Sequence, residues 1–195
     1  SSALFTRCVV LSCHSAHGET VSNGTGGAPR FVGCVFALNS AQFGGSAVGN
    51  VTLDSPEFRK CIFASNTCTN SVGGAMDNGY SSPVVANCVF VGNSGIRSGA
   101  IYNFRGATPV IANCTFDRNQ AAQNAGAIVS YSELPDYITA PIVANCILWN
   151  STPAEIFDNN NSISVTYSDV MGGYTGEGNF NPSKQPRFAA APSGF

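Results

Sequence analysis

The chain has 195 residues, only 10% of them charged, and a formal net charge of −2. Soluble domains usually carry about 25% charged residues, so no basic field is available here to attract nucleic acid or an anionic membrane. No apolar run approaches the length of about 18 residues that a membrane helix needs. We therefore expect no nucleic-acid partner, no membrane insertion by this segment and no signal peptide at its start.

The strongest pattern is an internal repeat centred on cysteine. The repeated cysteines are Cys8, Cys34, Cys61, Cys88, Cys114 and Cys146, spaced by 26, 27, 27, 26 and 32 residues. A first asparagine set follows the repeat phenylalanine by three residues: Asn39, Asn66, Asn93 and Asn119. A second set directly precedes the cysteine: Asn87, Asn113 and Asn145. Further along each repeat come small residues, as in Gly73-Gly74-Ala75, and then a proline that introduces the next strand, as in Pro83.

This period predicts an all-β chain forming a single right-handed parallel β-helix of about six to seven coils. Leucine-rich repeats share the period, but their Leu-x-x-Leu-x-Leu frame is absent. We expect about three short strands per coil, with equivalent residues stacked roughly 4.8 Å apart. In Cys-x-Phe both side chains share a strand face and should point inward. Both asparagine sets should lie at turns with their amides hydrogen-bonded along the stack, and Gly-Gly-Ala should mark a tight corner.

The coils are expected to occupy residues 1–170, as part of a longer solenoid, and residues 171–195 to form an irregular C-terminal cap. The 32-residue spacing places an insertion near 131–137, which we expect to bulge from one corner. Insertions in solenoids tend to lie on a functional face. Pro186, Arg187 and Phe188 are expected to cover the end of the stack, because exposed strand edges invite pairing.

These motifs resemble the repeats of chlamydial-type polymorphic outer membrane proteins, which combine Phe-x-x-Asn with Gly-Gly-Ala followed by an aliphatic residue. Phe63-Ala64-Ser65-Asn66 and Phe90-Val91-Gly92-Asn93 match the first motif, and Gly73-Gly74-Ala75-Met76 matches the second. Residues 167–188 also look like the closing segment of bacterial β-helix surface proteins. The resemblance spans roughly residues 5–190 and implies an exported, surface-exposed adhesin. The β-barrel anchor of that family is not part of this sequence.

Eight cysteines in an exported chain would ordinarily suggest disulfides. The six repeat cysteines should instead be buried thiols, because Cβ vectors of stacked residues run parallel. Cys13 and Cys68 lie about two coil rises apart, too far for a direct bond. Cys13, His14 and His17 lack the second ligand pair of a zinc site, so we expect no metal and no cofactor.

Parallel β-helices also host polysaccharide lyases and hydrolases, so catalysis is a second interpretation. Such enzymes need clustered carboxylates, whereas Asp77, Asp117 and Asp169 fall at different coil positions. An ice-binding solenoid would need threonines at the coil period, and these do not recur. Outward aromatic residues on one face would support glycan binding, and the candidates are Tyr80, Tyr102, Tyr131 and Tyr137.

Candidate glycosylation sites are Asn23, Asn50, Asn150 and Asn160, each in a predicted turn. Asn113 also fits the sequon but should be blocked within its stacked column. We expect a non-catalytic, extracellular structural or adhesive module of a cell-surface or filament protein. Its partners would be proteins or further copies bound through coil ends or lateral faces, or surface glycans. Polysaccharide binding or degradation is the alternative.

Overall fold

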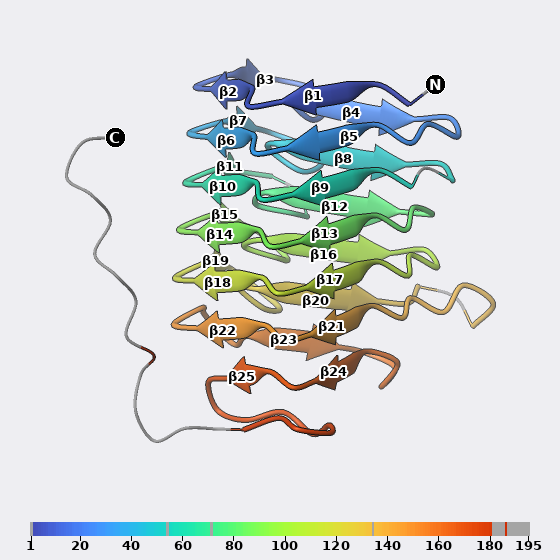
Figure 1. The fold of residues 1–195 in the computed structure, drawn as a ribbon, viewed down its shortest axis with the longest axis vertical. Coiled ribbons are helices and arrows are strands. Elements are labelled where there is room, and N and C mark those ends of the chain that lie inside the picture. Colours follow the sequence, from blue (N-terminus) through green and yellow to red (C-terminus); the bar gives the residue numbers. More distant parts are fainter. Residues whose placement is uncertain (1, 54, 71, 134, 181–185, 187–195) are drawn as a thin grey trace.

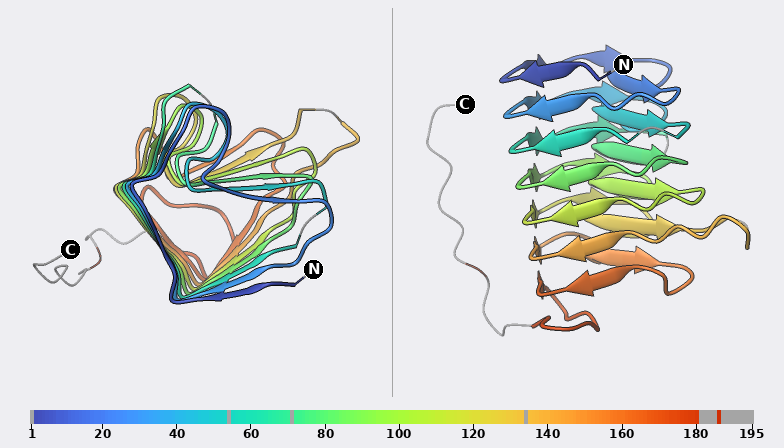
Figure 2. Two further views of the ribbon diagram at one scale, coloured as in Figure 1. Left: turned by 90° about the horizontal axis from the view of Figure 1, so that it is seen from above. Right: turned by 45° about the vertical axis from the view of Figure 1, so that its right-hand side comes forward.

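The structure, a computed structural model, describes residues 2–53, 55–70, 72–133, 135–180 and 186. These residues form a parallel β-helix of six full coils and two strands of a seventh, without a helix (Figure 1). Seen from the N-terminal end the chain turns clockwise as it descends, which makes the β-helix right-handed (Figure 2). The predicted fold class is confirmed.

The first five coils each contain four strands rather than the three expected, because their third corner carries a separate strand of only two residues, and the sixth coil contains three strands. Sheet A contains β1 (Leu4–Thr6), β5 (Arg30–Val32), β9 (Glu57–Arg59), β13 (Val84–Ala86), β17 (Val110–Ala112), β21 (Ile142–Ala144) and β24 (Ser164–Thr166). Sheet B contains β2 (Val9–Leu11), β6 (Val35–Ala37), β10 (Ile62–Ala64), β14 (Val89–Val91), β18 (Thr115–Asp117), β22 (Ile147–Trp149) and β25 (Asp169–Val170). Sheet C contains β3 (His14–Ser15), β7 (Ser40–Ala41), β11 (Thr67–Cys68), β15 (Ser94–Gly95) and β19 (Gln120–Ala121). Sheet D contains β4 (Val21–Gly24), β8 (Val48–Val51), β12 (Met76–Gly79), β16 (Ile101–Phe104), β20 (Ile128–Tyr131) and β23 (Ile156–Asp158).

The core consists of columns of equivalent side chains. Phe63 pairs in register with Phe36 on one side and with Phe90 on the other. Their rings stack in parallel, with centroids 4.8 Å and 4.6 Å apart, which is the spacing of the coils themselves. Burying one such ring contributes on the order of 2 kcal/mol, and each stacked pair adds roughly 1 kcal/mol. The alternation of inward and outward residues thus positions one phenylalanine above the next.

The small-residue corner is as tight as predicted. A Cβ on Gly74 would lie 1.9 Å from the carbonyl oxygen of Gly99, and one on Gly126 would lie 2.2 Å from that of Asn119. Isolated bridges join Gly73 to Ser98 and Ser98 to Ala125 across this corner. At this corner the backbone of the next coil, or of another part of the same coil, therefore lies too close for a side chain on these glycines.

The end of the stack is closed in part by residues that follow β25. The backbone of Phe180 bridges to Asp169, and the Tyr167 N–H donates to the Glu177 carbonyl at 2.8 Å. Residues up to 180 thus lie against the last two strands. The covering role expected for Arg187 and Phe188 falls outside the described residues.

Candidate functional site

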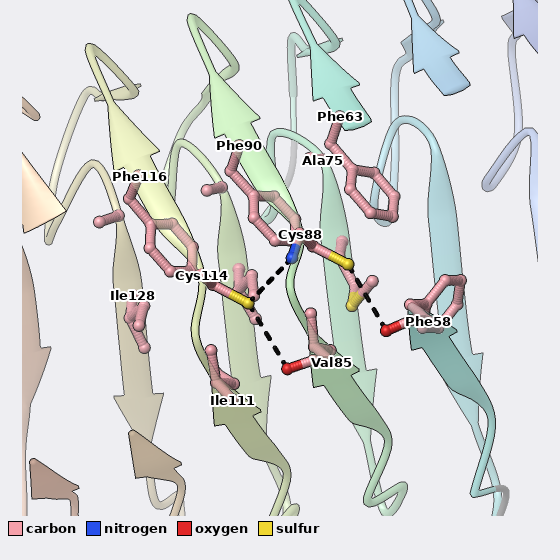
Figure 3. Close-up of a cluster of buried hydrophobic side chains, with 14 of the residues drawn as sticks. Phe58, Phe63, Ala75, Val85, Cys88, Phe90, Ile111, Cys114, Phe116 and Ile128 are labelled. Carbon is pink, nitrogen blue, oxygen red and sulfur yellow. Dashed lines mark hydrogen bonds between the residues drawn. The ribbon is translucent and has the colours of Figure 1, made fainter. Parts of the chain in front are cut away.

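The cysteine column lies in the interior between sheets A and B (Figure 3). All eight cysteines are free thiols, and the column members from Cys34 to Cys146 are buried. Cys8 is exposed because it belongs to the first coil, where no further coil lies above it. The expectation of a buried thiol is therefore wrong for Cys8 and correct for the five others. Of the two cysteines outside the column, Cys13 is exposed and Cys68 is buried.

The thiols also make hydrogen bonds between coils, which goes beyond the packing role that we expected. The backbone N–H of Cys88 donates to Cys114 Sγ at 3.4 Å, and the Cys114 thiol lies 3.5 Å from the carbonyl oxygen of Val85 (Figure 3). The column continues with other chemistry, since the Cys146 N–H donates to Ser168 Oγ and the Ser168 N–H donates to Asn179 Oδ1. At each column position from Cys61 to Ser168, the backbone N–H thus donates to a side-chain atom of the equivalent residue in the next coil or in the segment that follows the last coil.

The first asparagine set forms a ladder, as predicted. Asn66 Oδ1 accepts from the backbone N–H and from the side-chain amide of Asn39 at 3.1 Å and 3.0 Å. Its own Nδ2 donates to the Phe36 carbonyl and to Asn93 Oδ1, both at 2.9 Å. Because Asn39, Asn66, Asn93 and Asn119 are fully buried, these bonds are shielded from water.

The second set, Asn87, Asn113 and Asn145, is built differently. These side chains are exposed, and their φ angles of 54–55° place the backbone in the left-handed region that asparagine tolerates. Within the described residues no hydrogen bond joins their amides, so the expected ladder is wrong for this column. The left-handed corner leaves the side chain on the outside of the stack, exposed to solvent. Asn113 is accordingly not blocked by stacking.

A further ladder of asparagines was missed by the sequence reasoning. Asn23 donates to Asn50, Asn50 to Asn78 and Asn78 to Asn103, each bond measuring 2.8 Å from Nδ2 to Oδ1. Two of these residues were candidate glycosylation sites. Asn50 is fully buried and Asn23 is 9% exposed. A glycan on either amide would break the ladder, so both assignments are corrected to structural roles.

The two other sequons lie nearer the surface. Asn150 is half-buried and donates to Asp117 Oδ1 at 3.1 Å, whereas Asn160 is exposed after β23. The geometry therefore leaves Asn160 and Asn113 as the accessible candidates.

Buried carboxyl groups occur at separate places in the stack. Asp77, on sheet D, accepts from the Gly45 N–H at 3.0 Å, and burial together with the charge of Glu19 raises its pKa to about 8. Glu155 accepts from the Ser151 N–H at 2.8 Å, and burial raises its pKa to about 7. Asp117 lies on sheet B. Among the described residues no group of three His, Cys, Asp or Glu side chains is placed to hold a metal ion.

The tyrosines named as candidates gather on the outer side of sheet D and at the adjoining corner. Tyr102 and Tyr131 stack with ring centroids 6.4 Å apart, and Tyr80 meets Tyr137 edge-on at 5.5 Å. Tyr102 is only 1% exposed, and its hydroxyl lies 3.0 Å from Arg97 Nη1. Tyr80 and Tyr137 are the open members of the group, with exposed fractions of 41% and 44%.

Comparison with known protein families, with curated proteins and with solved structures finds no match to this chain. In the part of the chain that the structure describes, no helix has the length and apolar character needed to cross a membrane.

Proposed function

We propose that the chain is a non-catalytic structural and adhesive β-helix module of a cell-surface or filament protein, and that its N-terminal coil docks against another β-coil. The observation that carries the proposal is the difference between the two ends of the stack. The first coil presents the same columns as the internal coils with nothing above them, whereas the last strands are covered by residues up to 180.

The first coil has an incompletely buried core position. Phe5 stacks on Phe31 at 4.8 Å, yet it is 41% exposed while Phe31 is 5% exposed. Strands β1 to β4 are the terminal strands of their four sheets, so each has one row of backbone groups facing away from the stack. Edge strands of this kind are templates for pairing with another strand.

The polar ladders also end at this surface. In later coils the Oδ1 of a sheet D asparagine accepts from the coil before, as Asn50 accepts from Asn23. Asn23 holds the corresponding position in the first coil. A docked coil with an asparagine above Asn23 would extend the ladder. The same coil would also cover the exposed ring of Phe5.

Grafting one more coil tests the docking. A copy of residues 84–109 placed directly before Leu4 keeps the 26-residue register of β13 to β17. We expect this coil to raise the thermal unfolding midpoint by about 5 °C or more, because a repeat array gains one complete interface. The matched control is the same graft with Phe90→Asp in the copy. Equal midpoints for graft and control would contradict the docking proposal.

Self-association distinguishes docking between chains from docking within a chain. If copies dock through their first coils, sedimentation velocity should show concentration-dependent dimers, which Phe5→Lys should abolish. A monomer at all concentrations, together with a graft that does not stabilise, would sink the proposal.

The export and surface location are proposed from the motif resemblance and from a composition that is low in charge and rich in turn residues. Antibody labelling of intact producing cells checks them, and signal that appears only after permeabilisation would argue against them. The exposed Tyr80 and Tyr137 favour glycan binding as the adhesive contact.

A further inference from the structure

The insertion after β20 is firmly attached to the stack. It protrudes from the corner between sheets D and A (Figure 2). At its base Thr139 is fully buried, with its Oγ1 accepting from the Gly106 N–H at 3.1 Å and its N–H donating to Ser132 Oγ at 2.9 Å. Ala140 adds a backbone bond to Ala107 at 3.1 Å. The loop is therefore positioned by the two coils beside it.

On the side that faces the N-terminal end of the stack, the loop completes a group of two tyrosines, one arginine and one glutamate. Tyr137 packs edge-on against Tyr80, and the Arg105 guanidinium lies 5.9 Å from the centroid of the Tyr80 ring. Arg105 Nε also donates to Glu133 Oε2 at 3.0 Å. These four side chains come from two neighbouring corners and the loop, and all are exposed.

On the side that faces the C-terminal end of the stack, the loop borders a hollow of about 460 Å³. The hollow is lined by Ser132, Glu133, Pro135, Ile138, Asn159 and Asn160. Asn159 is held in place because its Oδ1 accepts from the Ser132 N–H at 2.8 Å and its Nδ2 donates to the Ser132 carbonyl at 2.9 Å. Glu133 belongs to both the hollow and the aromatic group, and so connects them.

We propose that this corner, from Tyr80 to Asn160, binds a neutral oligosaccharide. A sugar ring offers a face of C–H groups, which suits an exposed tyrosine ring, and an edge of hydroxyls. Hydroxyls both donate and accept, and so match a mixture of carboxylate, amide and guanidinium groups. The inference rests on the proposed adhesive function and names the chemistry of its contact.

The charge at the corner selects a neutral ligand. Within the group Arg105 is paired with Glu133, so an acidic chain finds no free guanidinium there, and a basic chain finds only the exposed loop carboxylate of Asp136 outside this pair. A protein partner would need a footprint of about 800 Å² per side, which exceeds a corner composed of four side chains and one hollow.

The test uses the full chain and a defined panel of cellotetraose, chitotetraose, mannotetraose and xylotetraose, with tetragalacturonate as an acidic comparator. Saturation-transfer NMR and calorimetry should show at least one neutral member binding with a dissociation constant below about 1 mM. Failure of all four neutral sugars, or tighter binding of tetragalacturonate, overturns the inference. Neither result affects the coil-docking experiment, so the two proposals fail separately.

Variants locate the site. Tyr137→Ala and Tyr80→Ala should each weaken binding by about 10-fold, as expected for an aromatic anchor. Tyr137→Phe, which keeps the ring, should stay within about 3-fold. The matched control is Tyr167→Ala, because Tyr167 is an exposed corner tyrosine outside the site, in the last coil. Unchanged affinity in both Tyr80 and Tyr137 variants, with thermal unfolding like that of the parent chain, would refute the location.

Discussion

The ladder of buried amides gives the most direct prediction, which is that Asn66→Ala strongly destabilises the fold. Removing this side chain takes away the acceptor of the Asn39 N–H and the donor to the Phe36 carbonyl. Both groups lie at a corner where Asn39 and Asn66 are fully buried, so water cannot replace the lost partner. An unsatisfied buried group costs about 1–3 kcal/mol, so the two together should cost about 2–6 kcal/mol.

Urea unfolding followed by circular dichroism measures this loss. The matched control is Asn87→Gly, because Asn87 is an exposed corner residue with a positive φ and glycine already occupies the equivalent position at Gly33. The control should change the free energy of unfolding by less than about 0.5 kcal/mol. If Asn66→Ala costs less than about 1 kcal/mol, or no more than the control, the reasoning from buried amides is refuted.

Three further predictions concern thiols, glycine and pH. A thiol reagent should label Cys8 and Cys13 rapidly in the folded chain and the buried cysteines only after unfolding; fast labelling of more than two thiols would contradict the described burial. Gly99→Ala should destabilise by more than about 2 kcal/mol, because its Cβ would lie 2.5 Å from the Gly126 carbonyl oxygen, and a neutral effect in urea unfolding would argue against that contact. The folded chain retains a proton on Asp77 up to about pH 8, whereas the unfolded chain releases it near pH 4, so stability should fall as pH rises between these values. Asp77→Asn should flatten that slope in thermal unfolding across the same range, and an unaltered slope would assign the effect to other groups.

The period and the alternation of residues were enough to predict the architecture. Cys-x-Phe placed two adjacent columns inside, because side-chain direction in a strand follows from sequence parity alone. The insertion near Tyr131 was also located correctly, since a longer spacing between equivalent residues can only be absorbed at a corner.

The asparagines show where sequence reasoning stops. Asn87 and Asn66 recur with the same period, but their roles depend on the backbone φ, which spacing does not reveal. The ladder from Asn23 to Asn103 has spacings of 27, 28 and 25 residues, a signal that was hidden because Asn23 and Asn50 also match glycosylation sequons. The exposure of Cys8 depends on its position in the first coil, which no local pattern encodes.

The ladders have a mechanical consequence. Their hydrogen bonds run along the stack axis, so a force applied between the two ends is carried by every coil boundary in series, and the terminal coils are the ones that can detach one after another. Such a chain should yield by peeling, each released coil of 26 or 27 residues lengthening the tether by roughly 9 nm. A surface appendage made in this way would dissipate a load by unfolding one coil at a time, and its coils would refold when the load is removed.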